Sequence, residues 1–180
     1  MKEEDQFDVI GNAPVLWFNS AMDLLMASAE IARSSRETAK KFDMPFTRSF
    51  WPRLMLRAFA IECLIKAHFL CAKKKLCSGG KYVGIVANER HDLQKLARHA
   101  GITLSGDEAH MLDRLSAVSV GTGRYPIFKS FDAPRKTGSS ERLRIEWAQP
   151  KDEVGFRTFL SRLVQPLDMQ SMYATLITEA

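Results

Sequence analysis

The chain has 180 residues, which suits one domain of ordinary size; 46% of them are hydrophobic and 26% are charged. This composition excludes a chain that is disordered throughout and, with only 10 Gly and 7 Pro, a collagen-like chain. The formal net charge is +5, but the first eight residues hold four acids and one base, so the remainder carries a net charge of +8. A basic body favours a polyanion partner, and a mildly positive soluble surface is the alternative.

The three cysteines, Cys63, Cys71 and Cys77, form no CxxC pair. This odd, sparse set is typical of a reducing compartment, so we expect a cytoplasmic protein with buried structural thiols. The acidic start does not match a signal peptide, and no apolar run approaches the roughly 18 residues of a membrane span. We therefore expect one domain over residues 1–180 without a membrane contact, in which residues 1–12 form a flexible acidic leader.

Two long helices are predicted in the first half of the chain. The first runs from Pro14 to about Lys41, with Asn12 as a plausible cap and apolar residues at helical spacing. The second runs from about Ser49 to Leu76 and is apolar nearly all the way around, which predicts a central position. We interpret residues 81–88 as a loop.

The sequence of the second half of the chain predicts shorter helices. His91–His99 forms one that stops at Gly101, and Ser105 with Glu108 has the spacing of a capping box for the next. Residues 121–141 predict a long loop, and the alternation at 143–147 predicts a short strand or an extended segment. The last helix covers 152–179, and Pro166 should kink or split it. The predicted fold class is all-α: an antiparallel up-and-down helical bundle of four to five helices, with a long loop and extended segment near 121–148.

Three groups of polar residues are candidates for chemistry. Glu62 and Lys66 are spaced i,i+4, which predicts an ion pair on one helix face, with a polar couple facing a cleft as the alternative. His91 precedes Asp92 at a helix start and can give or take a proton near neutral pH. Arg124, between glycines and Tyr125-Pro126, suits a phosphate or, equally, the carbonyls of a helix end. The histidines and cysteines show no zinc spacing, so we predict neither a metal site nor a cofactor.

Three segments resemble motifs of HEPN domains. Residues 60–67 (AIECLIKA) resemble the "A-I-E-x-L-x-K-A" segment of their second helix, and His91-Asp92-Leu93 with Leu96 resembles "H-D-L-x-x-L". Residues 123–126 (GRYP) resemble the "x-R-Y-P" that follows the next helix. The resemblance implies a helical bundle that forms a homodimer. It also implies a defence or toxin–antitoxin role, either as a metal-independent endoribonuclease or as a non-catalytic protein that binds RNA or a nucleotide.

The chain departs from the catalytic HEPN pattern, in which four to six residues separate an Arg from the following His, because no such pair is present. If the protein is an enzyme, we expect metal-independent RNA cleavage. His91 would then act as general base or acid, Arg124 would stabilise charge on the phosphorus centre, and Glu62 would orient a partner. The expected nucleic-acid contacts are Lys66, Lys73, Lys74, Lys75 and Tyr125.

The expected partners are RNA or a nucleotide, a second copy of the chain, and a cognate antitoxin protein. Two other functions remain open. One is a non-catalytic interaction module that docks through its dimer face and the basic loop 121–141. The other is a helical dimer that binds a small molecule.

Overall fold

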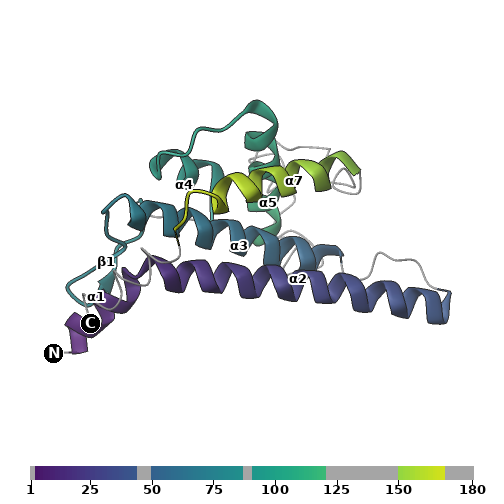
Figure 1. Ribbon diagram of the computed structural model, residues 1–180, viewed down its shortest axis with the longest axis horizontal. Helices are drawn as coiled ribbons and strands as arrows, with labels where there is room; N and C mark the ends of the chain where they lie inside the picture. The colour runs from purple at the N-terminus through teal and green to yellow at the C-terminus, as the bar shows by residue number, and fades with distance from the viewer. Residues whose placement is uncertain (1–2, 44–49, 87–90, 121–149, 169–180) are drawn as a thin grey trace.

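The computed structural model describes residues 3–43, 50–86, 91–120 and 150–168 (Figure 1). These residues form an all-α bundle, as predicted, with one very short hairpin. The helices and strands are α1 (Glu3–Gly11), α2 (Pro14–Phe42), α3 (Phe50–Cys71), β1 (Cys77–Ser78), β2 (Lys81–Tyr82), α4 (Leu93–His99), α5 (Gly106–Val120) and α7 (Pro150–Val164).

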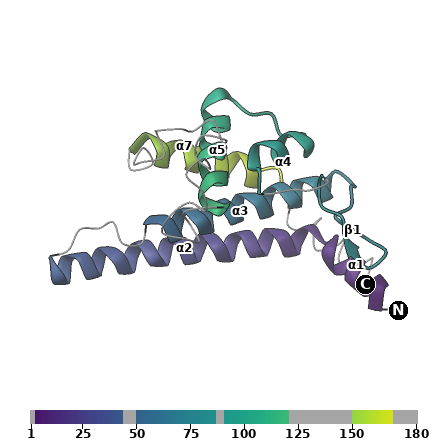
Figure 2. The ribbon, with the colours of Figure 1, turned by 180° about the vertical axis from the view of Figure 1, so that it is seen from behind.

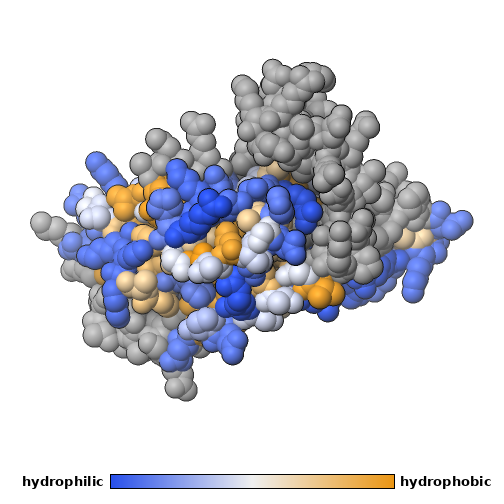
Figure 3. All heavy atoms as spheres, turned by 90° about the horizontal axis from the view of Figure 1, so that it is seen from above, coloured by the Kyte–Doolittle hydropathy of each residue, from blue (hydrophilic) through white to orange (hydrophobic). Residues whose placement is uncertain are grey.

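Helix α3 lies in the middle of the bundle. Helix α2 runs antiparallel along one side of it, and α4, α5 and α7 lie on the other side (Figures 1 and 2). Seen from above, over α4, α5 and α7, the described surface is mainly hydrophilic with scattered hydrophobic side chains (Figure 3). Because α3, the most apolar helix, lies between α2 and the other three helices, the prediction that it is central is confirmed.

The core forms where α3 meets its four neighbouring helices. Burying one large aliphatic or aromatic side chain stabilises the fold by about 1.5–3 kcal/mol, so this core is the main stabilising contribution. Its largest fully buried side chains include Ile61, Leu64 and Ile65 of α3, Leu93 and Leu96 of α4, Leu112 and Leu115 of α5, and Phe159 and Leu163 of α7. None of the helices within the described ranges is long and apolar enough to cross a membrane.

Several predicted helix ends are confirmed. The Ser105 amide donates to the Glu108 carboxylate at 2.8 Å, and the Glu108 amide donates to Ser105 Oγ at 3.3 Å, which is a capping box. Gly101 follows α4 with a φ of 82°, a conformation that glycine adopts without strain. Helix α7 ends at Val164, before Pro166, because proline cannot continue the backbone hydrogen bonding.

The start of the chain differs from the prediction of a flexible leader, because residues 3–11 form helix α1. Asp8 accepts hydrogen bonds from the amides of Gly79 and Gly80 at 2.7 and 3.0 Å, which ties α1 to the hairpin. Asn12 does not cap α2, whose N-cap is Ala13. Its side chain instead bonds the backbone between the end of α3 and β1: Oδ1 accepts from the amides of Leu76 and Cys77, and Nδ2 donates to the Cys77 carbonyl.

Two further boundaries differ from the prediction. Helix α3 ends at Cys71 rather than near Leu76, since Lys73 takes a left-handed conformation (φ 61°) that no helix continues through. Part of the predicted loop 81–88 is strand β2, which pairs antiparallel with β1 in the register Cys77↔Tyr82 and Ser78↔Lys81. The predicted Ser49 cap, the loop and extended segment over 121–148, and the end of the last helix lie outside the described residues.

Candidate functional site

Helix α3 carries a buried ion pair at the centre of the candidate site. Glu62 and Lys66 are one turn apart, and Lys66 Nζ donates to Glu62 Oε1 at 2.7 Å. The two residues are only 7% and 6% exposed. The predicted ion pair is therefore present, and it lies inside the fold rather than on its surface. A buried charge that loses such a partner is costly, so the two side chains hold each other in place.

Two aromatic rings enclose the ammonium of Lys66. Its Nζ lies 4.9 Å from the ring centre of Trp17 on α2 and 5.3 Å from that of Tyr82 on β2. The faces of both rings carry partial negative charge and attract a cation. Burial acts to lower the pKa of Lys66, but the charge and hydrogen bond of Glu62, with a smaller contribution from the Tyr82 side chain, raise it above its usual value. Lys66 is therefore charged at all physiological pH values.

The second carboxylate oxygen of Glu62 binds His91. His91 Nδ1 lies 2.6 Å from Glu62 Oε2, and because an ionised carboxylate only accepts, Nδ1 donates its proton. The ring of Phe59, also on α3, contacts the imidazole of His91 edge-on, with the ring centres 5.6 Å apart. The backbone of His91 is left-handed, with a φ of 58°. A non-glycine residue in this conformation is strained, so the surrounding contacts must hold it there.

These contacts make a row of four groups, His91–Glu62–Lys66–Tyr82, which we call the buried relay. Its two central groups are buried, whereas the His91 side chain is 37% exposed and Tyr82 is 43% exposed. Because Glu62 fixes Nδ1 as the donor, Nε2 of the imidazole is the atom that can accept a proton from a ligand. A carboxylate that orients an imidazole in this way suits the imidazole to act as a general base.

The structure brings two of the three predicted catalytic residues, Glu62 and His91, into direct contact. Arg124 and Tyr125 lie outside the described residues. The predicted helix start at His91 is displaced, because Asp92 is the N-cap of α4 and its side chain accepts from the Lys95 amide at 2.9 Å. His91 thus stands just before the helix, where its side chain can turn back to α3.

The predicted phosphate-binding lysines are in different surroundings. Lys66 is buried and bonded to Glu62, so its ammonium is not presented to a polyanion. Lys73 and Lys75 are exposed on the segment that follows α3, as a phosphate contact requires. Lys74 is also exposed, but its Nζ donates to the His99 carbonyl at 3.2 Å and lies 4.9 Å from the Phe69 ring centre. Lys74 therefore has a structural role in joining α3 to α4.

Neither the thiols nor a metal cluster adds a second reactive centre in the described part of the chain. Burial raises the pKa of the Cys63 thiol to about 11, which makes it a poor nucleophile at neutral pH. Of the two helix thiols predicted to be buried, Cys63 is half-buried and Cys71 is exposed, so Cys71 does not fit the prediction; Cys77 is buried. Within the described ranges, no three His, Cys, Asp or Glu side chains come together as metal ligands would.

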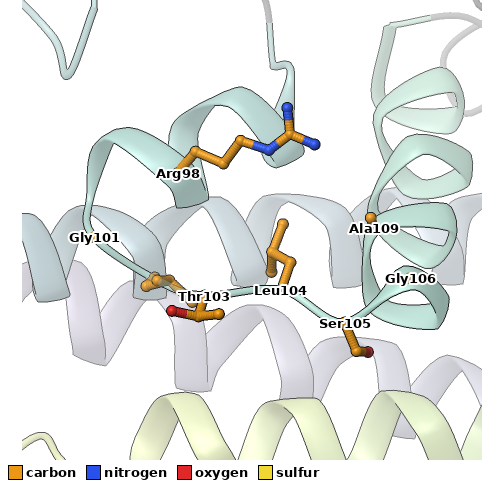
Figure 4. Close-up of a pocket in the computed structure, with 8 residues that line it drawn as sticks. Arg98, Gly101, Thr103, Leu104, Ser105, Gly106 and Ala109 are labelled. Carbon is orange, nitrogen blue, oxygen red and sulfur yellow. The ribbon is translucent and has the colours of Figure 1, made fainter.

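A shallow hollow of about 530 Å³ lies between α4 and α5 (Figure 4). Two of its polar side chains already have partners: Ser105 belongs to the capping box, and the Arg98 guanidinium donates to Gln94. None of the predicted site residues lines it. The hollow therefore has no part in the chemistry considered below.

Trp17 and Tyr82 are the site residues that sequence reasoning missed. Trp17 marks an apolar helix face in the sequence, and Tyr82 belongs to a segment interpreted as a loop. No family model, curated protein or solved structure matches this chain. The case for a function therefore rests on the geometry of the buried relay and on the sequence motifs.

Proposed function

We propose that this protein is a HEPN-like RNA-binding protein of a defence or toxin–antitoxin system and that it cleaves RNA without a metal ion. The observation that carries the proposal is the 2.6 Å contact between Glu62 and a partly exposed His91. It is supported by the net basic charge of the chain beyond its first eight residues and by the order of the three sequence motifs.

RNA suits a site of this kind because it supplies its own nucleophile. His91 Nε2 takes the proton from a ribose 2′-hydroxyl, and the 2′ oxygen forms a bond to the adjacent phosphorus. The bond from phosphorus to the 5′ oxygen breaks, and that oxygen leaves with a proton from water. The products are a 2′,3′-cyclic phosphate and a 5′-hydroxyl, and the imidazolium returns its proton to solvent. Glu62 keeps the imidazole in the required tautomer and stabilises the imidazolium.

The first experiment separates this chemistry from contamination and from metal-dependent cleavage. Purified protein is incubated in EDTA with single-stranded and structured RNA and with DNA of the same sequence. We expect cleavage of RNA only, since DNA has no 2′-hydroxyl, with cyclic phosphate ends identified by mass spectrometry. His91→Gln should lower the rate by about 10²–10⁴-fold, the usual contribution of a general base.

The matched control is His99→Gln, which removes an exposed histidine of α4 whose Nδ1 lies near the Lys95 carbonyl. Cleavage by His91→Gln at the rate of the His99→Gln control would contradict the proposal. Arg124→Ala tests the remaining predicted catalytic residue. If this variant cleaves as fast as the wild type, Arg124 has no part in the reaction.

A second candidate function, RNA binding without cleavage, is favoured by the fact that both oxygens of Glu62 are already bonded within the fold. The relay would then hold the segment before α4 in place, and exposed Lys73 and Lys75 would contact phosphates. A mobility shift that weakens steeply with added salt, without any cleavage, supports this candidate. Sedimentation of the pure protein tests the homodimer that the HEPN resemblance implies.

A further inference from the structure

The hairpin that follows α3 presents an aromatic side chain to solvent. Tyr82 of β2 is 43% exposed, and Val83 beside it is 53% exposed. Tyr82 pairs with Cys77 of β1, and the next amide, that of Val83, donates to the Leu76 carbonyl at 2.8 Å. Cys77 and Leu76 are both buried, so the backbone on either side of the exposed ring is fixed to the fold.

Two contacts from the start of the chain also hold this hairpin in place. The Asp8 carboxylate accepts from both amides of its turn, and the Asn12 side chain bonds the backbone where β1 begins. A side chain on an ordered strand loses little backbone freedom when a ligand binds to it, which lowers the cost of binding. The hairpin therefore presents Tyr82 in a form that suits a binding contact.

Trp17 of α2 lies beside Tyr82 and widens the aromatic surface. The two ring centres are 6.3 Å apart, and the ring planes are inclined by 38°. The indole Nε1 of Trp17 donates to the Gly11 carbonyl at 3.0 Å, so the polar edge of this ring is satisfied within the fold. Because Trp17 is partly buried, Tyr82 is the ring of this pair that is more open to a ligand.

Exposed lysines come from the same part of the chain. Lys81 directly precedes Tyr82, and Lys73 and Lys75 lie on the short segment that leads from α3 into β1. The acidic first turn of α1 lies at the turn of the hairpin, where Glu4 is close to the glycines. Aromatic rings combined with basic residues are typical of surfaces that bind single-stranded nucleic acid, since bases stack on the rings and phosphates meet the cations.

The aromatic pair is one helical turn from the proposed catalytic contact. Lys66 Nζ lies 5.3 Å from the Tyr82 ring centre. His91 bonds to Glu62, which precedes Lys66 by four residues, or about 6 Å along α3. One RNA strand can therefore contact Tyr82 with one nucleotide and His91 with another.

We propose that Tyr82, supported by Trp17, stacks a base of the RNA strand that the protein binds, so that the substrate is single-stranded RNA. This inference rests on the proposed function and names the class of RNA that the site takes. Stacking on a side chain requires a base that is splayed out of a helix, which single strands and loops supply and a duplex does not. Every base has a π-face, so we expect little preference for sequence.

The test measures binding separately from cleavage. Fluorescence anisotropy in EDTA compares a single strand with a duplex of the same sequence, both made of 2′-O-methyl RNA. This RNA has no free 2′-hydroxyl and so is not cleaved by the proposed route. We expect the single strand to bind more tightly than the duplex. Equal or tighter binding of the duplex, or no binding of the single strand, would overturn the proposal.

Variants of the hairpin locate the stacked base. Tyr82→Ala should weaken binding of the single strand about 5- to 150-fold, the usual contribution of one base stacked on an aromatic ring. Tyr82→Phe restores the ring and should restore the affinity. The matched control is Val83→Ala, which shortens the neighbouring exposed side chain and should leave the affinity unchanged. If Tyr82→Ala does not fold, Tyr82→Leu, which has no ring, replaces it with the same expectation. Unchanged affinity in the variant without a ring overturns the proposal.

A strand of the same length without bases separates stacking from phosphate contacts. This abasic strand keeps every phosphate but has nothing to stack, so Tyr82→Ala should not weaken its binding. An equal loss of affinity for the abasic and the intact strand would mean that Tyr82 acts on the phosphates or on the fold. That result would also overturn the proposal.

The outcomes for this site and for the ribonuclease function are distinct. Binding of the single strand that depends on Tyr82, without cleavage of ordinary RNA, supports this inference and removes the ribonuclease function. Cleavage of RNA with equal affinity in the wild type and Tyr82→Ala retains the ribonuclease function and overturns the stacking site. Self-association in sedimentation that Tyr82→Ala abolishes, without binding of the single strand, assigns the ring to a contact between copies of the chain and overturns the proposal as well.

Discussion

Replacing Glu62 with glutamine tests the buried relay most directly. At a separation of 2.7 Å and an effective dielectric constant of about 20, the attraction between Lys66 and Glu62 is about 6 kcal/mol before desolvation is subtracted. Removing the charge of one partner of a buried ion pair costs about 3–5 kcal/mol, because the other charge stays buried without compensation. In a chain of this length that corresponds to an unfolding temperature lower by roughly 10 °C.

The matched control is Glu37→Gln. Glu37 forms the same i,i+4 contact, with Arg33 at 2.6 Å, but its side chain is 62% exposed. Water screens this pair, so its loss should change stability little. Urea denaturation followed by circular dichroism gives both free energies of unfolding. A cost for Glu62→Gln that is no greater than that of the control would refute the view that burial makes the Glu62 contact important.

The pH dependence of the same variant gives an independent check. In the wild type, burial alone would lower the pKa of Lys66, but Glu62 and Tyr82 raise it above 10.5. The stability contributed by Lys66 is thus fully present below pH 10.5 and is lost above it. In Glu62→Gln, burial acts without Glu62, so the folded chain binds the proton less tightly than the unfolded chain. The difference in free energy of unfolding between the wild type and Glu62→Gln should therefore shrink by up to about 1.4 kcal/mol per pH unit on going from pH 7.5 towards 10.5.

Three other changes test the contacts that hold the fold. Asn12→Ala should destabilise the fold by about 2–4 kcal/mol in urea, because it removes the acceptor for the buried Cys77 amide. Gly11→Ala should also destabilise it, since the new Cβ would lie 2.2 Å from Cys77 Sγ, and adding Cys77→Ala should restore stability. Burial lowers the pKa of His68, so stability should fall as the pH drops below 6.5, and His68→Gln should flatten that dependence between pH 7 and 5. A cost below about 1 kcal/mol for Asn12→Ala would contradict the first prediction. The second fails if the double variant is no more stable than Gly11→Ala, and the third fails if His68→Gln leaves the pH dependence of stability unchanged.

The sequence predicted those parts of the fold that depend on neighbours within a few turns. The apolar spacing of α2, α3, α4 and α5 and the capping box at Ser105 are local patterns, and the structure confirms them. The end of α3 was predicted too late because Leu76 and Cys77 are buried and continue the apolar pattern. Their burial comes from the hairpin and from Asn12, which is 64 residues away from Leu76 along the chain.

Helix α1 could not be predicted for a related reason. Its sequence begins with three acidic residues and none of its residues is buried, so no apolar stripe reveals it. Its position depends on Asp8, which bonds to amides 71 and 72 residues later. Such contacts follow from the tertiary fold and have no local signal.

The candidate site likewise combines one contact that follows from local sequence spacing with others that depend on the tertiary fold. The contact between Glu62 and Lys66 follows from helix geometry and could be predicted. The approach of His91 could not, because 29 residues separate it from Glu62. Trp17 and Tyr82 come to Lys66 from α2 and β2, and single aromatic residues in a sequence do not reveal that they face a cation. The resemblance of His91 to a family motif was the signal that connected this residue to Glu62 on α3.

The conformation of His91 bears on whether the relay only stabilises the fold. A purely structural histidine would be expected to lie inside the fold with a relaxed backbone, as a buried polar group with satisfied hydrogen bonds. His91 instead keeps a strained, left-handed backbone and leaves 37% of its side chain in solvent. Glu62 and Phe59 together hold it in that position, and strained residues held by their surroundings cluster at sites that bind ligands. The cost of this conformation is easier to explain if the exposed edge of the imidazole meets a substrate. His91 and Glu62, rather than the more deeply buried Lys66, are therefore the residues to test first in an RNA cleavage assay.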